Sequence, residues 1–204
     1  MREVLIATNN RGKAKDFEVL FKPFGIQVLT LNDIEGAIDV EETGVTFEEN
    51  AILKAETVAR LLGKIVIADD SGLEIDALDG APGVYSARYA GGEKSDDANI
   101  DKVLQELETV SGDDRTARFR CVLALAGPDI QTETFSGSCE GLIHTERKGT
   151  YGFGYDPIFY VPEKNKMMAE LTPEEKNAIS HRGAALAQLG TKLPQFMKGV
   201  GDQK

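Results

Sequence analysis

Residues 64–73 read KIVIADDSGL, an apolar run followed directly by two aspartates, a serine and a glycine. The run Lys64–Ala68 predicts a buried strand, and ligands in α/β folds bind beyond the carboxyl ends of such strands. Asp69 and Asp70 are costly to bury there unless a metal ion or hydrogen bonds satisfy both carboxylates. The stretch indicates either a site for a hard cation such as Mg²⁺, which uses one or two carboxylates together with substrate phosphates, or a turn in which an aspartate caps backbone amides.

Strands and a helix also alternate before this stretch. Glu3–Ala7 and Ile26–Leu31 predict two strands. Between them, apolar residues recur at three- and four-residue spacing, which predicts a helix that ends at Gly25 and buries one face. That face carries Phe17, Leu20, Phe21 and Phe24.

The remainder of the chain predicts a mixed α/β fold. Two long strand-like runs flank a turn at 127–130 and indicate an antiparallel pair. The glycine-rich segment 79–95 predicts a long irregular loop, which in a compact domain is usually functional or mobile. The expected elements are a helix opened by a capping box at Thr46 and running to about Leu62, a helix over Asp97–Val110, strands over Ala117–Ala126 and Gln131–Ile143, a short segment Pro157–Val161, a capped helix from Thr172 to a break near Ser180, and a last helix from about His181 to Met197.

Composition describes an acidic protein of ordinary polarity. The 204 residues carry a net charge of −11, with 41% hydrophobic and 28% charged residues, which indicates one large domain or two small lobes around a substantial core. The chain has no run of 18 apolar residues and no signal-peptide pattern, so we expect a cytoplasmic protein that does not associate with membranes. The acidic balance argues against a nucleic-acid polymer as partner, whereas a small anionic ligand needs only a few local cations.

Cysteine and histidine are too few for the common metal centres. Cys121 and Cys139 lie in strand-like segments and are expected in the core without a disulfide. His144 and His181 are the two histidines, so zinc coordination by a cluster of His and Cys is not expected.

The loop Thr8–Lys13 lies between the first strand and the first helix. Backbone amides and the dipole at a helix start attract anions, Lys13 adds a positive charge, and Gly12 allows close approach. The loop is not a Walker A motif, because Ala7 replaces the first glycine and Ala14 the magnesium-binding Ser or Thr. It indicates either a phosphate-binding loop or a capped turn with a solvated lysine.

Carboxylates and a lysine also gather near the second helix. Glu41 and Glu42 precede this helix, in which Asn50 and Lys54 are four residues apart and share a face. Surface solvation is the ordinary role of such an acidic pair. Together with the aspartates at 69–70, however, the pair gives the chain enough carboxylates for a Mg²⁺ site.

Two further segments carry groups suited to a flat ring. Phe153 stands beside glycine and could stack on a nucleobase, although such a residue more often fills the core. His181 and Arg182 begin the last helix, and their hydrogen-bond donors suit a purine carbonyl, although a lone histidine is more often structural. Together the segments supply an anion-binding loop, cations, metal-binding carboxylates, an aromatic platform and ring-edge donors, which is a complete set for a nucleoside triphosphate.

Five of these segments closely resemble the inosine triphosphate pyrophosphatase family, which includes bacterial dITP/XTP diphosphatases. They are TNNRGK (8–13), EETGVTFEENAILKA (41–55), ADDSGLEIDALDGAPGVYSARYAG (68–91), FGYDPIF (153–159) and ELTPEEKNAISHRG (170–183). The match is collinear from the first strand to the last helix, and Gln131–Lys148 shares only strand-like character. The resemblance implies an elongated mixed β-sheet flanked by helices, two lobes with the cleft between them, a single domain over 1–204, and a homodimer.

The resemblance also implies an activity and the residues that perform it. The activity is Mg²⁺-dependent hydrolysis of a deaminated purine nucleoside triphosphate (dITP, ITP or XTP) to the monophosphate and pyrophosphate. Asp70 is implied as the proton acceptor, and Glu41 and Asp70 as the metal ligands. The implied substrate-binding residues are Thr8, Asn9, Asn10, Arg11, Gly12, Lys13, Lys54 and Ser71 for the phosphates, Phe153, Gly154, Tyr155 and Asp156 for base and sugar, and Lys176, His181 and Arg182 for the base.

Two rival functions use a similar pocket. A pyrophosphatase for modified pyrimidine or methylated triphosphates could share the architecture, but Phe153 and the His-Arg-Gly segment favour a purine. A non-catalytic nucleotide sensor would not need the adjacent aspartates. Turnover of dITP with Mg²⁺ therefore separates an enzyme from a sensor.

Overall fold

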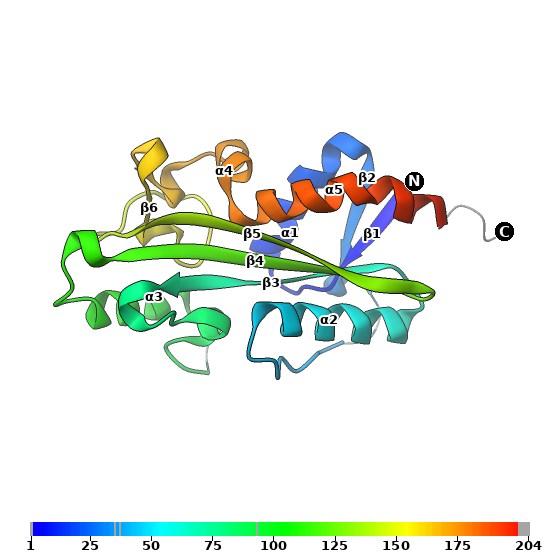
Figure 1. The fold of residues 1–204 in the computed structure, drawn as a ribbon, viewed down its shortest axis with the longest axis horizontal. Helices are drawn as coiled ribbons and strands as arrows, with labels where there is room; N and C mark the ends of the chain where they lie inside the picture. The colour runs from blue at the N-terminus through cyan, green and yellow to red at the C-terminus, as the bar shows by residue number, and fades with distance from the viewer. Residues whose placement is uncertain (1, 35, 37, 93, 200–204) are drawn as a thin grey trace.

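The computed structural model describes residues 2–34, 36, 38–92 and 94–199. The strands are β1 (Arg2–Ile6), β2 (Ile26–Thr30), β3 (Val66–Ile75), β4 (Thr116–Gly127), β5 (Ile130–Ile143), β6 (Phe159–Val161) and β7 (Lys166–Met167). Within the described residues they form one sheet in the order β2-β1-β3-β4-β5-β6-β7, which runs along the length of the molecule (Figure 1). The β2, β1 and β3 strands are parallel, and from β3 onward neighbouring strands are antiparallel. This arrangement confirms the predicted elongated mixed sheet; the division into two lobes stays a prediction.

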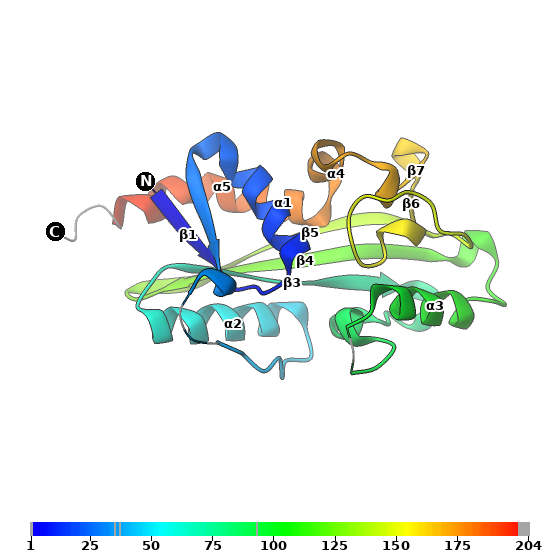
Figure 2. The same cartoon turned by 180° about the vertical axis from the view of Figure 1, so that it is seen from behind.

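Helices cover both faces of the sheet. They are α1 (Arg11–Phe21), α2 (Phe47–Leu62), α3 (Asp96–Glu106), α4 (Pro173–Ile179) and α5 (His181–Gly199), with 3₁₀ turns at Lys22–Phe24, Leu31–Asp33, Asp76–Leu78, Gly83–Arg88, Gly112–Asp114, Asp156–Ile158, Pro162–Lys164 and Met168–Glu170. Helices α1 and α5 lie on one face and α2 on the other, and α3 lies on the same side as α2 toward the far end (Figures 1 and 2). The helical layers confirm the predicted α/β class.

The buried hydrophobic residues form three clusters, which follow the helical layers. One cluster joins α1 and α5 to the sheet and includes Phe17 and Phe21, and a second joins α2 to the opposite face. A third cluster lies around α3 and the β4–β6 end of the sheet. Cys121 and Cys139 are buried in this core with free thiols, as predicted for core residues.

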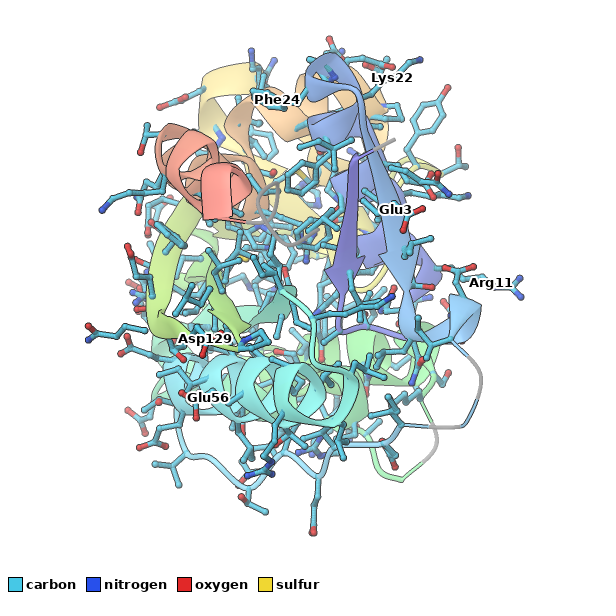
Figure 3. The ribbon with its side chains drawn as sticks, turned by 90° about the vertical axis from the view of Figure 1, so that its right-hand side faces the viewer. Glu3, Arg11, Lys22, Phe24, Glu56 and Asp129 are labelled. Carbon is cyan, nitrogen blue, oxygen red and sulfur yellow. The ribbon has the colours of Figure 1, made fainter. Side chains whose placement is uncertain are left out.

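Helix α1 ends earlier than its apolar pattern predicts. The side chain of Phe24 is 59% exposed, at the surface of the molecule, rather than on the buried face (Figure 3). The chain tightens into a 3₁₀ turn after Phe21, and Gly25 takes a left-handed φ of 63°, so Phe24 is rotated off the helical stripe. The side chain of Leu20 lies outside the described part of the structure.

The prediction that the central strand ends at Ala68 is wrong. Strand β3 continues to Ile75, and Asp69 pairs with Leu123 and Asp70 with Val122 of β4 in an antiparallel ladder. Aspartate is disfavoured in strands, but strand propensity yields to tertiary context. Here the ladder satisfies the backbone and buried cations satisfy the side chains, so neither carboxylate is a turn cap.

The position of the two aspartates within a strand separates their side chains. Successive residues of a strand point to opposite faces of the sheet, so Asp69 faces α1 and α5, while Asp70 faces α2. Strand β1 pairs with β3 at Val66 and Ile67, and the chain then leaves the sheet as the loop into α1. The carboxyl end that forms the site is therefore that of β1, beside the middle of β3.

The segment 79–95 is more ordered than its composition predicts. It contains the 3₁₀ helix Gly83–Arg88, and the Ser86 hydroxyl accepts from the Leu73 amide at 2.9 Å. Asn99 binds the segment from α3, accepting from the Ala90 amide at 2.7 Å. The segment is thus held by hydrogen bonds to strand β3 and to α3, which its glycine-rich composition does not reveal.

The other predicted helices are confirmed with shifted ends. Helix α3 ends at Glu106, four residues before the expected boundary, because the chain there passes into hydrogen-bonded turns. The Thr46 and Thr172 capping boxes open α2 and α4, and α5 begins at His181 after the break at Ser180. Over the residues described, no helix is long and apolar enough to cross a membrane.

Candidate active site

A cleft of about 340 Å³ is lined by the loop from β1 into α1 and by the middle of β3. Helix α2 and the Gly83–Arg88 turn form one wall, and the 153–156 loop with the start of α5 forms the other. The predicted site residues that line it are Thr8, Asn9, Asn10, Lys13, Lys54, Asp70, Ser71, Phe153, Gly154, Tyr155, Asp156, Lys176, His181 and Arg182. Segments far apart in sequence are thus brought into one cavity.

The loop Thr8–Lys13 is capped at its helix start. The Asn10 side chain accepts from the amides of Gly12 at 2.8 Å and Lys13 at 3.1 Å. Lys13 is not the solvated lysine of a simple turn: its side chain is 15% exposed, and Nζ lies 2.5 Å from the Asp69 carboxylate. Arg11 points outward at the surface and, like Gly12, does not line the cleft (Figure 3).

Gly12 has a specific neighbour. A Cβ at this position would lie 2.5 Å from a ring carbon of Phe153, so the glycine allows the aromatic ring to pack directly on the first turn of α1. The Phe153 ring also lies 4.8 Å from the Lys176 ammonium. The structure shows Phe153 close to Gly12, and the close approach of a phosphate to this glycine stays a prediction.

We expect Gly12→Ala to displace this ring. Because the clash is with a side chain on a loop rather than with backbone, the fold should survive while Phe153 moves. If Phe153 stacks on the base, its loss is worth about 1–3 kcal/mol, so KM for dITP should rise about 10-fold with little change in kcat. Steady-state kinetics of the variant test this. A Phe153→Ala background should abolish most of the further loss from Gly12→Ala, and an equal loss in both backgrounds would contradict the ring-displacement account.

Lys54 occupies the centre of the α2 wall. Its ammonium donates to Glu42 at 2.8 Å, to the backbone carbonyl of Asp69 at 2.8 Å and to Asp70 at 3.1 Å, which uses all three donors. Burial lowers the pKa of Lys54, but the fields of Asp70 and Glu42 outweigh it and raise the pKa above its usual value. Lys54 is therefore charged.

The loop before α2 directs Glu42, and not Glu41, toward Lys54. Gly44 packs against the first turn of α2, where its amide donates to the Asn50 side chain at 2.8 Å. Glu42 lines the cleft and also accepts from Arg88 at 3.4 Å, whereas Glu41 is exposed and does not line it. The assignment of Glu41 as a metal ligand stays a prediction, and Glu42 is a second candidate. Because the two glutamates are adjacent in the sequence, the sequence alone could not show which of them faces the cleft.

Asp70 has one oxygen committed and one without a partner. Its Oδ1 accepts from Lys54, while the buried Oδ2 has no hydrogen-bond partner among the described residues. Burial raises the pKa of Asp70, against the opposing field of Lys54. An orphaned carboxylate oxygen beside Glu42 fits a cation such as Mg²⁺, which needs only one or two carboxylates besides substrate phosphates. In the part of the chain that the structure describes, no three His, Cys, Asp or Glu side chains gather into a fuller metal site.

Asp69 lies on the other face of the strand and is fully paired. Burial alone would raise its pKa, but the fields of Arg182 and Lys13 hold the pKa well below its usual range. Its side chain has no exposed surface. Asp69 is therefore an ionised carboxylate inside the protein.

The 153–156 loop is held from three sides. Asp156 accepts from the Phe153 amide at 2.9 Å and from Lys176 at 2.7 Å. The amide of Gly154 donates to Asp96 at 2.7 Å, and the Tyr155 hydroxyl donates to the Ser86 carbonyl at 2.8 Å. Phe153 is thereby presented to the cleft on a fixed loop.

His181 is buried at the start of α5. Its ring stacks on Phe119, with centroids 5.0 Å apart and planes at 21°, and Nδ1 has no partner among the described residues. Burial and the nearby Arg182 lower the pKa of His181 well below its usual value. The imidazole is therefore neutral, with a nitrogen available to a ligand.

A neutral buried His181 makes stability depend on pH in a definite direction. The unfolded chain binds a proton on this histidine below about pH 6.5, and the folded chain does not, so the free energy of unfolding falls as pH falls through that value. The loss should be about 1.3 kcal/mol between about pH 7 and about pH 5.5. Urea unfolding at both pH values, in the parent and in His181→Gln, measures it. An equal pH dependence in the two proteins would contradict the assignment.

Arg182 is enclosed by carboxylates. Its Nε donates to Asp69 at 2.7 Å, Nη1 to Asp16 at 2.5 Å and Nη2 to Ser71 at 3.1 Å. The guanidinium carbon lies 6.0 Å from the centroid of the Phe153 ring. Contact with a purine base stays a prediction, but the structure adds a second role, because Arg182 neutralises the buried Asp69.

Comparison with known proteins identifies the family. A sequence model of the Ham1 family matches residues 4–192. A Bacillus cereus protein named dITP/XTP pyrophosphatase is 57% identical over 201 residues, covering 98% of both chains. The chain belongs to the Ham1 family.

Solved structures of the Ham1 family have the same fold. The Ham1 protein of Staphylococcus aureus superposes with a TM-score of 0.84 and 52% identity, covering 95% of this chain and 99% of its own. A HAM1 protein from Coxiella burnetii gives a TM-score of 0.85 and 47% identity, covering 96% of this chain and 100% of its own. The family predicted from the five motifs is therefore confirmed, together with the fold.

Several residues of this Ham1-family cleft were not predicted. Phe119 lies near the start of β4, where the sequence gives no sign that it differs from an ordinary strand residue. Ser86 and Arg88 come from the glycine-rich segment, and Lys94 and Asp96 from its junction with α3. The available signal was the length of that segment, since long loops in compact domains are often functional.

Proposed function

We propose that this chain hydrolyses deaminated purine nucleoside triphosphates, namely dITP, ITP and XTP, to the monophosphate and pyrophosphate. The 57% identity to a protein named dITP/XTP pyrophosphatase supports this reaction. The observation that carries the proposal is Asp70, a buried carboxylate with an unpartnered oxygen in a cleft that is also lined by Lys13, Lys54 and Phe153. Together these residues provide a proton acceptor, positive charge for the phosphates and an aromatic ring on which the base can stack.

Two lysines that line the cleft suit the phosphates. Lys13 and Lys54 supply local positive charge within a chain of net charge −11. Phosphoryl chemistry depends mostly on positioning and charge neutralisation. Asp70 accepts the proton of the attacking water, or orients that water, through the oxygen that Lys54 does not occupy. Attack at the α-phosphorus releases the β and γ phosphates as pyrophosphate, whose charge the lysines neutralise.

Mg²⁺ is the proposed cofactor. Asp70 would hold it, with Glu41 as the family resemblance implies or with Glu42, whose side chain lines the cleft. When bound, the cation supplies an acidified water and neutralises charge on the phosphates. Lys54 bonds both Asp70 and Glu42, so it keeps two carboxylates together in the cleft before any cation binds.

The residues Phe153, His181 and Arg182, which also line the cleft, suit the base. Hypoxanthine and xanthine carry a 6-oxo acceptor where adenine carries an amino donor. A neutral His181 whose unpartnered Nδ1 carries the proton would donate to the oxo group, and Arg182 adjoins it. A site built to pair a polar substituent rejects an analogue lacking it by factors of about 10⁴. Phe153, fixed by its loop, would stack on the ring.

A substrate panel tests the proposal. Release of pyrophosphate would be measured with Mg²⁺ for dITP and XTP, and for dATP, dGTP, dUTP and a methylated dNTP as controls. The proposal expects dITP and XTP to have the largest kcat/KM. Preference for dUTP or the methylated substrate would instead indicate a pyrophosphatase for other modified nucleotides, and binding of dITP without turnover would indicate a sensor.

We also propose that the protein acts as a homodimer in the cytoplasm. Val45, 77% exposed, and Tyr85, 57% exposed, border one groove on the α2 side of the molecule, where Phe47 and Val84 are also present. Phe47 is buried there, so the support for a contact surface is the pair of exposed apolar side chains, Val45 and Tyr85. Light scattering of the purified protein would give twice the mass of 22.1 kDa if the dimer forms.

A further inference from the structure

Asp69 collects hydrogen bonds from four different side chains. Lys13 Nζ lies 2.5 Å from Oδ1, and the Ser71 hydroxyl donates to the same oxygen at 2.9 Å. Arg182 Nε donates to Oδ2 at 2.7 Å, and Cys121 Sγ lies 3.2 Å from that oxygen. Lys13, Ser71 and Arg182 line the cleft, as does Asp69, and these three partners of Asp69 are predicted to bind substrate. The Asp69 side chain points to the opposite face of the sheet from that of Asp70.

We propose that Asp69 is a positioning residue, whose buried carboxylate fixes Lys13 and Arg182 in the orientations in which they bind substrate. The proposal rests on the proposed function for the identity of that substrate. One carboxylate thereby contacts both Lys13, which is predicted to bind phosphate, and Arg182, which is predicted to bind the base.

Lys13 contacts both the carboxylate and the backbone carbonyl oxygen of Asp69. Besides the Asp69 carboxylate, its ammonium donates to the Asp69 backbone carbonyl at 3.5 Å. An ammonium has three donors, so one remains for a ligand. The Lys13 side chain is 15% exposed and lines the cleft. A lysine already held in one rotamer loses less conformational freedom when it binds a phosphate.

The Arg182 guanidinium is held by hydrogen bonds to Asp69 and Asp16. Its Nε and Nη2 both face Asp69, the second at 3.5 Å, and Nη1 faces Asp16. The guanidinium is planar, so these contacts fix its orientation as well as its position. Asp69 provides two of the contacts and Asp16 one, which makes Asp16 a matched control.

Removing Asp69 has opposite consequences in two accounts. If Asp69 only competes with phosphate for Lys13, then Asp69→Asn frees the lysine, removes a negative charge and strengthens the binding of anions. If Asp69 positions Lys13, the same substitution weakens anion binding. The sign of the change distinguishes the two accounts.

Calorimetric binding of inorganic tripolyphosphate, without metal, measures that sign. We expect Asp69→Asn and Lys13→Met each to weaken binding about 10-fold or more, the size of a lost charge-assisted hydrogen bond. The double variant should bind no more than about twofold more weakly than Lys13→Met, because Asp69 acts through Lys13. Asp16→Asn, which leaves the Lys13 contact intact, should stay within about twofold of the parent. Unchanged or tighter binding by Asp69→Asn, multiplied losses in the double variant, or an equal loss in Asp16→Asn would each overturn the proposal.

Two further measurements test the proposal if Asp69→Asn does not fold and for the contact with Arg182. If Asp69→Asn does not fold, the same comparison is made in an Arg182→Gln background, where the buried charges are balanced. For the Arg182 contact, the ratio of kcat/KM for dITP over dATP should fall about 10-fold in Asp69→Asn, and an unchanged ratio would overturn that part. A parent protein that binds tripolyphosphate through Lys13 but does not hydrolyse dITP would overturn the proposed function and leave the Lys13 role of Asp69 standing.

Discussion

Asp70→Asn is expected to lower kcat for dITP by about 10²–10⁴-fold while leaving the protein folded. A positioned general base contributes a factor of that size, and any loss of Mg²⁺ adds to it. Asparagine keeps an oxygen at the position that accepts from Lys54 at 3.1 Å, so the wall of the cleft should persist. What the variant loses is the second carboxylate oxygen, the one that has no partner among the described residues.

The control for this variant is Asp76→Asn. Asp76 follows the same strand, but its carboxylate pairs with Arg118 at the surface, so its loss should leave kcat within about twofold of the parent, since surface pairs contribute little. Rates are compared at saturating Mg²⁺. An Asp70→Asn variant whose kcat stays within about threefold of the parent would reduce Asp70 to a structural partner of Lys54.

Arg182→Ala is expected to lower the free energy of unfolding by about 3–5 kcal/mol, because it leaves the fully buried Asp69 without its main counter-charge. Arg182 itself is 1% exposed and bonds Asp69 and Asp16. Urea unfolding measures the change. The control is Arg118, which pairs with Asp76 and Glu140 at the surface, and Arg118→Ala should cost about 1 kcal/mol or less.

The same variant tests base recognition if activities are compared as ratios. Because the folded fraction cancels, kcat/KM for dITP divided by kcat/KM for dATP reports how Arg182 affects the discrimination between the two bases. A charge-assisted bond to the 6-oxo group predicts a fall of about 10-fold or more in that ratio. Equal losses for the two substrates would assign Arg182 to the phosphates or to structure alone.

Local signals in the sequence predicted most of the fold. The capping boxes at Thr46 and Thr172 and the helical spacing of Phe17 and Phe21 are short-range features, and each element they predicted is present. The error at Ala68 arose because the continuation of β3 depends on pairing with β4, a strand distant in the sequence. Nothing in the segment itself distinguishes two paired aspartates from a turn.

The candidate site was predicted as a set of motifs, but not as contacts. Collinear motifs identified most of the cleft residues, yet the choice between Glu41 and Glu42 depends on how Gly44 packs on α2. The buried role of Arg182 depends on Asp16 and Asp69 meeting it from two other elements. Such pairings between distant segments are set by the fold, so spacing alone could not supply them.

The most direct test of the proposed function is hydrolysis of dITP in ¹⁸O-labelled water with Mg²⁺, followed by phosphorus NMR. Attack at the α-phosphorus predicts dIMP carrying the label and unlabelled pyrophosphate in equal amounts, with no orthophosphate. Formation of dIDP and labelled orthophosphate would place the attack at the γ-phosphorus and contradict the proposed roles of Asp70, Lys13 and Lys54.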